Sequence, residues 1–196
     1  MTSNQVFAEL VQRIGAGGNV RDDFPFTLGD VMPHLDYSFS YAVKSRMNEI
    51  YASTRTYGID SSITKRYTIP VSDNVGQLPV SIVRLPNDLG VYQVQYKGNV
   101  FKKTTPDYVD KFLGLAAIHV VDQPRYWIED DQIKFFGLGH KDCDVTALLI
   151  PLPSSLEPDD EILFPAGYET MIIDTVLQRM GFGFQIPQDP ANDGKK

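Results

Sequence analysis

The sequence predicts an α+β protein with helices at both ends of the chain and a β-rich region between them. Apolar residues recur at helical spacing before about residue 56 and again after residue 165, whereas they alternate with polar residues in the middle. We therefore expect a single domain over residues 1–181, with a helical part at 1–56, a β-rich part at 57–153 and a last helix at 165–180. The helices should form a small bundle, and residues 182–196 an extended C-terminal arm.

The N-terminal third contains two helix-start signals. A first helix can be capped by Thr2 or Ser3. A second can start at Thr27, because Asp30, three residues on, forms a rough capping box with it. We expect Pro33 to interrupt this second helix, which then resumes and continues to about residue 55.

The middle region predicts about five or six short strands. Apolar runs lie at 67–69 and 80–83, and the last and strongest strand is expected at 144–152. Two hairpins are expected, one across a glycine-containing turn and one across Asp130-Asp131, and a short helix should lie between them. The first hairpin pairs 91–96 with 100–103, the second pairs 125–129 with 132–136, and the helix covers 106–113.

The composition excludes several classes of protein. Eighteen basic residues against 25 acidic ones give a net charge of −7, so we expect no tight binding to duplex DNA. The apolar runs are too short to span a bilayer, and the first residues lack the basic and apolar stretches of a signal peptide. We therefore expect no membrane association and a soluble protein made in a reducing cytoplasm. The single cysteine, Cys143, excludes an internal disulfide and a multi-cysteine zinc site.

Cys143 is the one candidate nucleophile with a histidine close in sequence, His140. Nucleophilic catalysis needs a base aligned with the thiol and donors for an oxyanion, and the sequence supplies no such partners. The neighbouring Asp142 and Asp144 should raise the pKa of the thiol, which makes it less reactive. We therefore interpret this segment as a loop between strands and expect no catalytic residue.

No motif predicts a metal or cofactor site. The histidines at 34, 119 and 140 lack ligand spacing, and the acidic residues lack the pattern of a calcium loop. We expect the acidic run at 159–161 to be a solvated turn whose side chains diverge, and the glycine-rich run at 15–18 to end a helix rather than bind phosphate. The carboxylates weighed as a possible cation site are Glu129, Asp130, Asp131, Asp142 and Asp144. The sequence thus predicts no enzyme, no metal and no cofactor.

The C-terminal arm carries the candidate partner-binding residues Phe182, Phe184 and Ile186. They alternate along the chain, so an extended arm would present all three to one side. Apolar residues on a polar arm need a pocket, either on a partner or on their own domain, and the sequence leaves both alternatives open.

The C-terminal half resembles the adaptor (head-completion or connector) proteins in the neck of tailed bacteriophages. The resemblance rests on the hairpin at 126–136, the strand at 145–152, the acidic loop leading to Phe164-Pro165, and the helix at 166–180. The segment Val83-Arg84-Leu85-Pro86-Asn87-Asp88-Leu89 is similar to a Leu-Pro-x-Asp element of that family, and the helix at 36–55 matches in placement. Residues 92–112 have no counterpart in it.

The resemblance implies a non-enzymatic structural protein that forms a homo-oligomeric ring in the virion neck, at the head-to-tail interface, after assembly in the host cytoplasm. Its partners would be the portal protein and other neck or tail proteins, and the viral genome would pass through the ring without sequence-specific binding. On a twelve-fold portal such a ring would carry about 84 formal negative charges, which would repel DNA rather than hold it. Two alternatives stay open: a tail-terminator, stopper or tail-hub ring protein of the same virion, and an unrelated soluble ligand-binding or enzymatic α+β domain.

Overall fold

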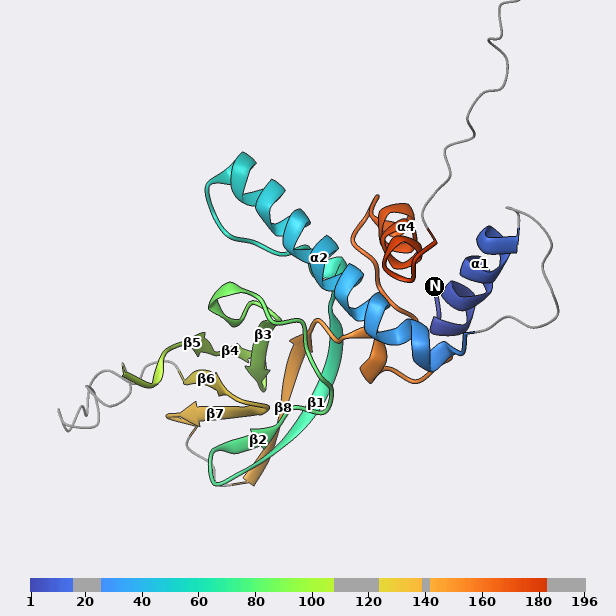
Figure 1. Ribbon diagram of the computed structural model, residues 1–196. Helices are drawn as coiled ribbons and strands as arrows, with labels where there is room; N and C mark the ends of the chain where they lie inside the picture. The colour runs from blue at the N-terminus through green and yellow to red at the C-terminus, as the bar shows by residue number, and fades with distance from the viewer. Residues whose placement is uncertain (16–25, 108–123, 139–141, 183–196) are drawn as a thin grey trace, which may run out of the picture.

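The protein is α+β, as the sequence predicts, with helices from both ends of the chain beside a mixed sheet (Figure 1). The computed structural model describes residues 1–15, 26–107, 124–138 and 142–182. The described helices are α1 (Ser3–Gly15), α2 (Leu28–Thr54) and α4 (Glu169–Arg179), with short 3₁₀ turns η1 (Ser61–Ile63), η2 (Pro86–Asp88) and η3 (Pro153–Ser155). The strands are β1 (Lys65–Ser72), β2 (Val75–Gln77), β3 (Val91–Tyr96), β4 (Asn99–Val100), β5 (Lys102–Lys103), β6 (Arg125–Glu129), β7 (Gln132–Phe136) and β8 (Asp142–Leu149).

Both predicted N-terminal caps are present. The Thr2 hydroxyl accepts a hydrogen bond from the Gln5 backbone N–H at 3.2 Å, and the Thr2 N–H donates to the Gln5 side chain. At α2, Thr27 and Asp30 form a capping box, which confirms that prediction. The predicted interruption at Pro33 is wrong, because α2 runs through it without a break. Pro33 is exposed and lies within two turns of the helix start, where its missing N–H frees only a carbonyl near the solvated end of the helix.

The last helix begins later than the predicted residue 165. Gly167 has a φ of +81°, which no helical residue adopts, so α4 starts only at Glu169. Ile172 and Val176, two of the apolar residues that recur at helical spacing after residue 165, are fully buried. The buried face also includes Ile173 and Leu177, which the sequence pattern did not single out. The buried face is therefore centred on these four residues, whereas Met171 and Met180, which the pattern also placed on the apolar face, are only partly buried.

The eight strands form one sheet in the order β4-β3-β8-β1-β2-β7-β6-β5, and this sheet closes on itself. Its two ends, β4 and β5, are consecutive pieces of one chain segment. Within that segment Phe101 donates its N–H to Val94 of β3 at 2.8 Å, whereas Lys102 donates to Pro124, beside β6, at 3.0 Å. One segment therefore pairs on both sides, antiparallel to β3 and parallel to β6, so the described strands leave neither end of the order unpaired.

The prediction of about five or six strands is too low. Residues 80–83 form no strand, and only an isolated bridge joins Ile82 to Pro151. Instead β1 turns through residues 73–74 into β2, which pairs with both β1 and β7. Asp73 and Asn74 both have positive φ, which this tight turn requires. Aspartate and asparagine tolerate positive φ better than most residues, so the Asp-Asn pair in the sequence already indicated a turn here. Residues 108–113 of the short helix predicted at 106–113 lie outside the described residues.

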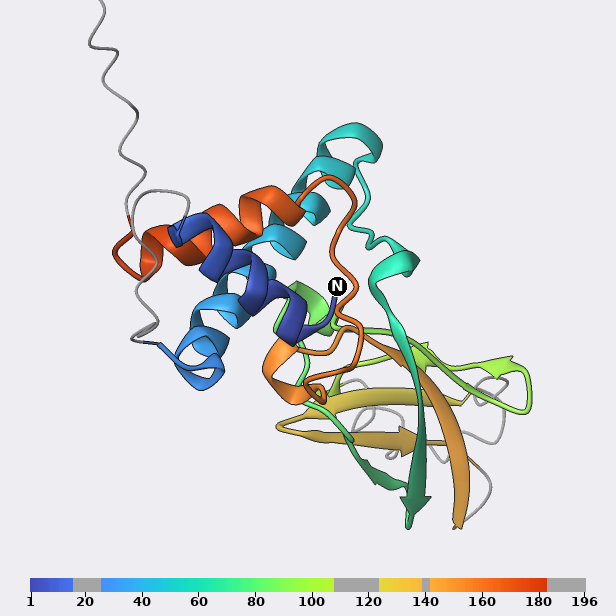
Figure 2. The same cartoon turned by 90° about the vertical axis from the view of Figure 1, so that its right-hand side faces the viewer.

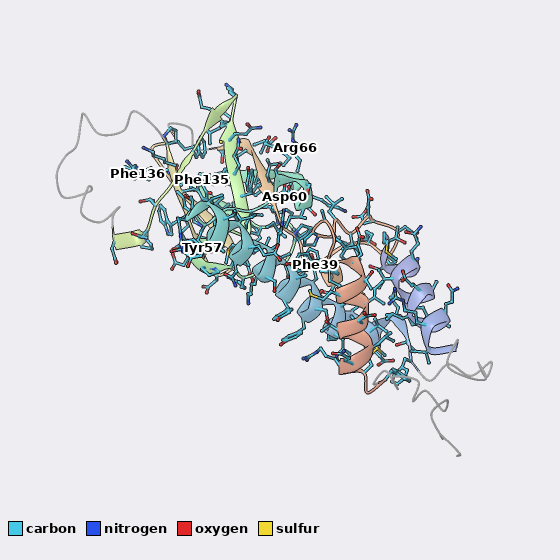
Figure 3. The ribbon with its side chains drawn as sticks, turned by 90° about the horizontal axis from the view of Figure 1, so that it is seen from above. Phe39, Tyr57, Asp60, Arg66, Phe135 and Phe136 are labelled. Atoms are coloured by element: carbon cyan, nitrogen blue, oxygen red, sulfur yellow. The ribbon has the colours of Figure 1, made fainter. Side chains whose placement is uncertain are left out.

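The molecule has two hydrophobic cores, one among the helices and one inside the sheet. Figure 2 shows the helical part and the sheet that contain them. Figure 3 labels one aromatic residue of each, Phe39 among the helices and Phe135 in the sheet. The two cores meet along the chain that leaves β8, where Leu149 belongs to the sheet core and the next residue, Ile150, to the helical core. Ile150 accepts a hydrogen bond from the Val83 N–H at 3.0 Å and donates one to the Gly90 carbonyl at 2.9 Å. These backbone hydrogen bonds thus join the end of β8 to the segment at 83–90, whose Val83 and Leu85 are buried in the helical core.

Candidate interaction surface

The exposed aromatic residues are concentrated on α2. Among the described residues the large apolar side chains that stay exposed are Tyr37, Tyr41, Tyr57, Tyr92 and Val100. Tyr37 and Tyr41 lie one helical turn apart and are 51% and 52% exposed, whereas Tyr92 and Val100 are on the sheet. We call Tyr37 and Tyr41, together with Arg179 of α4, the tyrosine ridge.

The ridge is held in place by contacts between α2 and α4. The guanidinium of Arg179 lies 3.8 Å from the centre of the Tyr37 ring, a cation–π contact. About two helical turns beyond Tyr41 along α2, the Glu49 Oε1 atom accepts a hydrogen bond from the Tyr168 hydroxyl at 2.5 Å, and Arg46 pairs with the other Glu49 oxygen at 3.0 Å. These contacts tie the N-terminus of α4 to the C-terminal half of α2 and its C-terminus to Tyr37.

The hydrogen bond between Tyr168 and Glu49 shifts the pKa of both groups. It lowers the pKa of Glu49 below its ordinary 4.5, with a further contribution from Arg46. The same hydrogen bond, followed by burial, raises the pKa of Tyr168. At neutral pH Glu49 is therefore a carboxylate and Tyr168 a neutral phenol that donates to it. Because the two pKa values are shifted apart, the pair serves as a fixed structural contact and not as a site of proton transfer.

The C-terminal end of α2 projects beyond the other helices (Figure 1). Tyr51 and Tyr57 stack there with ring centroids 4.3 Å apart, and Tyr57 is 46% exposed. Arg55 ends the helix in the left-handed conformation, with φ of 58°, so the chain turns back toward the sheet. This end is a second exposed aromatic feature, on the same helix as the ridge.

Of the three residues predicted to bind a partner, only Phe182 lies within the described part of the chain. Its backbone N–H donates to the Leu177 carbonyl at 2.9 Å, and its half-buried ring packs against the helical core. The ring also makes an edge contact with Phe26, at 5.6 Å between centroids. Phe182 therefore contacts its own domain. Phe184 and Ile186 lie outside the described residues, so their docking on a partner stays a prediction.

Cys143 lies in β8, not in the loop that the sequence predicted for its segment, and it pairs opposite Val71 of β1. Burial raises the pKa of its thiol, and Asp144 and Asp142 raise it further, which confirms the predicted direction. His140 lies outside the described residues. The arrangement at Cys143 therefore offers a weakly acidic thiol on a strand.

The acidic residues that sequence analysis considered as ligands have separate partners. Three of the five each contact a different side chain: Glu129 bonds Lys134, Asp131 bonds Arg84, and Asp142 accepts from Ser72. The predicted divergence of the acidic run is confirmed, because Asp159, Asp160 and Glu161 contact Asn4, Lys65 and the N-terminal amine, respectively. Within the described ranges, no group of three or more His, Cys, Asp or Glu side chains is placed to hold a metal ion.

The Leu-Pro-x-Asp element lies at the junction between the two cores. Leu85 is buried in the helical core, and η2 follows it with left-handed backbone at Asn87 and Asp88. The Lys103 ammonium of β5 donates to the Asn87 carbonyl and lies 3.4 Å from the Asp88 carboxylate. Burial lowers the pKa of Lys103, and Asp88 opposes that effect. The element thus joins the segment that closes the sheet to the helices.

The sequence analysis missed the tyrosine ridge. The signal was present, because Tyr37, Tyr41 and Lys44 share the face of α2 opposite the buried Leu35, Phe39 and Ala42, following helical spacing. Aromatic residues are enriched where proteins bind one another, so this helix face is a candidate interaction surface. No helix among the described residues is long and apolar enough to cross a membrane. Comparison of the sequence with known proteins found no family model that matches it and no matching curated protein.

Proposed function

We propose that this chain is a structural protein of a tailed-bacteriophage head-to-tail connector, in which copies of it form a ring that joins the portal to the tail. The chain has no enzymatic role in this proposal. The ring lines the path along which the genome passes, and it contacts neighbouring ring proteins above and below.

The observation that carries the proposal is the tyrosine ridge. Tyr37 and Tyr41 expose about half of their surface at neighbouring positions of one helix, and Arg179 covers one of the rings. Tyrosine and arginine are the residue types enriched where proteins bind one another, whereas most ligand sites are concave. Such a surface favours assembly with other proteins over the binding of a small molecule.

The coupling of the two cores also supports an assembly role. Hydrogen bonds of Ile150 to Val83 and Gly90, and the contacts of Lys103 with η2, hold the segment at 83–90 against the sheet. The same segment buries Val83 and Leu85 in the helical core. A subunit that transmits contacts between proteins above and below it needs this kind of rigid connection. The net charge of −7 per chain suits a ring through which DNA slides, because like charges keep the polyanion from adhering.

Native mass spectrometry of the full chain, alone and with the portal protein of the same virus, tests the proposal. We expect capture by the portal ring in a stoichiometry set by its symmetry. A chain that stays monomeric at every accessible concentration and is never captured by the portal would overturn the proposal. As a matched pair, Tyr41→Asp should weaken capture or ring formation, whereas Tyr92→Asp, at an exposed tyrosine of the sheet, should not.

A further inference from the structure

The tyrosine ridge lies beside the place where the C-terminal arm begins. Arg179, the last residue of α4, contacts the Tyr37 ring, and Phe182 follows it three residues later. The Phe182 N–H donates to the Leu177 carbonyl at 2.9 Å, so Phe182 stays within about one helical turn of Arg179. The arm, residues 183–196, therefore starts close to the ridge of its own chain.

The arm is long enough to cover the ridge. An extended residue spans at most about 3.3–3.6 Å, so residues 183–187 alone reach up to about 17 Å. Tyr37 and Tyr41 are one turn apart on α2, which is about 6 Å along the helix axis. The arm can thus pass over both rings within its own molecule.

The ridge is aromatic on two helices. The half-buried Tyr168 of α4 lies near Tyr41, which adds to the rise in the Tyr168 pKa that the hydrogen bond to Glu49 and burial cause. Three phenol rings, two from α2 and one from α4, therefore line one side of the helical part. Glu49, further along α2, is occupied by its contacts with Arg46 and Tyr168.

The exposed stripe of α2 that contains the ridge has no acidic residue. It follows helical spacing through Pro33, Tyr37, Tyr41, Lys44 and Asn48, all of which are exposed. Its cation is Lys44, and Arg179 of α4 adds a second one beside Tyr37. Neither cation forms a salt bridge within the part of the chain that the structure describes. The surface is therefore aromatic and positively charged.

The arm has a sequence that suits an aromatic surface. Pro187-Gln188-Asp189-Pro190 is a Pro-x-x-Pro segment, and the apolar Phe184 and Ile186 precede it. Segments of this type favour the extended polyproline conformation and bind surfaces lined by aromatic side chains, because little backbone entropy is lost on binding. Proline rings packed on tyrosine rings are thus the contact that these two sequences favour.

The charges of the arm and the ridge are also complementary. Residues 183–193 contain two acidic side chains, Asp189 and Asp193, and no basic one. Opposite charges on two surfaces favour their association and fix its register. Asp189 lies inside the Pro-x-x-Pro segment, so docking of that segment brings a carboxylate to the cations Lys44 and Arg179.

The arm of the same chain has an advantage over a second copy as the occupant. Because it is attached about one turn from the ridge, its effective concentration there is on the order of millimolar. A second copy would have to reach a comparable concentration to compete. The own arm is therefore the occupant that the position of Phe182 favours.

We infer that in the free subunit the C-terminal arm folds back over its own tyrosine ridge, with the Pro-x-x-Pro segment on Tyr37 and Tyr41 and Asp189 beside Lys44 and Arg179. The inference rests on the proposed function, because it takes the arm and the ridge as two assembly surfaces of one subunit. Each surface then covers the other before assembly. The portal uncovers the ridge when it binds the arm, so the ridge contacts neighbouring proteins only on the portal.

NMR spectroscopy of the full chain with a nitroxide spin label on the arm tests this inference. Cys143→Ser removes the native thiol, and Asn192→Cys places the label on the arm and leaves Asp189 in place. We expect the label to broaden the amide signals of Tyr41 and Lys44 until they are lost. The signal of Ala8, on the exposed face of α1, should remain.

Two matched substitutions in the labelled chain identify the contact. Tyr41→Ser should lower the equilibrium constant for docking at least about tenfold and restore the Lys44 signal. Tyr92→Ser, at an exposed tyrosine of the sheet, should leave the Lys44 signal broadened. Both tyrosines are exposed, at 52% and 40%, so neither substitution should affect folding. Equal effects of the two substitutions would overturn the inference.

Two other outcomes would also overturn it. Equal broadening of Lys44 and Ala8 would show that the arm has no preferred site on the helical part. A mixture of spin-labelled chains with isotope-enriched, unlabelled chains tests for a second copy, and loss of the Lys44 signal in that mixture would place the arm on another molecule. The portal is absent from all of these samples, and its capture of the chain is measured separately. Failure of the inference is therefore distinguishable from failure of the proposed function.

Discussion

Replacement of Gly90 by alanine should destabilise the junction between the two cores. A Cβ atom at this position would lie 2.2 Å from the Val83 carbonyl oxygen, a backbone atom, and 3.3 Å from the Ile82 side chain. The φ of Gly90 is outside the left-handed region, so the cost comes from the contact and not from backbone strain. Relief of the contact requires a shift of the backbone at Val83 or Gly90, and both residues hydrogen-bond Ile150, the residue that follows β8.

The expected cost is that of overpacking a core, about 1–3 kcal/mol. For a chain of this size, that corresponds to a fall of roughly 2–12 °C in melting temperature. Gly29→Ala is the matched control, because its Cβ would meet only the Thr27 hydroxyl, at 3.5 Å, in the first turn of α2. It should be neutral or stabilise by up to about 1 kcal/mol. Thermal unfolding followed by circular dichroism measures both variants, and equal stabilities for the two would refute the reasoning.

Three further substitutions and one pair of truncations test other parts of the structure. Ile172→Asp places a carboxylate in the fully buried face of α4 and should cost several kcal/mol, so a variant that melts like the parent would contradict the assigned face. Cys143→Ser should leave folding and assembly unchanged, and a folded variant that fails to assemble would show that the thiol has a role. In the parent chain, alkylation of Cys143 at neutral pH should be slow, because the pKa of its thiol is raised. Because the pKa of Glu49 is lowered, its contribution to stability is complete above about pH 4.5 and is lost as the pH falls through the lowered pKa. Glu49→Gln should therefore remove that part of the loss of stability at acid pH. Identical plots of stability against pH for the variant and the parent would argue against the bond to Tyr168. A chain that ends at Phe182 should keep its stability and lose capture by the portal. A chain that ends at Gly181 should also melt at a lower temperature, because Phe182 packs on the helical core. Full capture of either truncated chain would show that the arm does not dock on the portal.

Local signals account for the parts of the fold that the sequence predicts well. The capping box at Thr27 and the apolar periodicity of Ile172 and Val176 depend on residues close in the chain, so sequence spacing is enough to find them. The continuity of α2 through Pro33 was missed because the sequence does not show that the carbonyl left without its N–H partner, four residues before Pro33, lies at the exposed start of the helix.

Pairing between distant segments explains what the sequence left out. Closure of the sheet depends on the N–H groups of Phe101 and Lys102 pointing to different neighbours, and no periodicity within residues 99–103 encodes this. The buried position of Ile150 in the helical core, next to Leu149 in the sheet core, likewise depends on the assembled layers. The sequence contains enough to predict the candidate surface, since Tyr37 and Tyr41 lie on the polar face of a predicted helix. The contact of Arg179 with the Tyr37 ring could not be predicted, because it depends on how α4 packs on α2.

Electron microscopy of the full chain mixed with the portal protein of its own virus tests the central proposal most directly. The proposed function predicts a closed ring of this chain stacked coaxially on the portal, with neighbouring subunits joined through their helical parts and a central opening wide enough for duplex DNA. A portal without an added ring, at chain concentrations well above those of the portal, would contradict it.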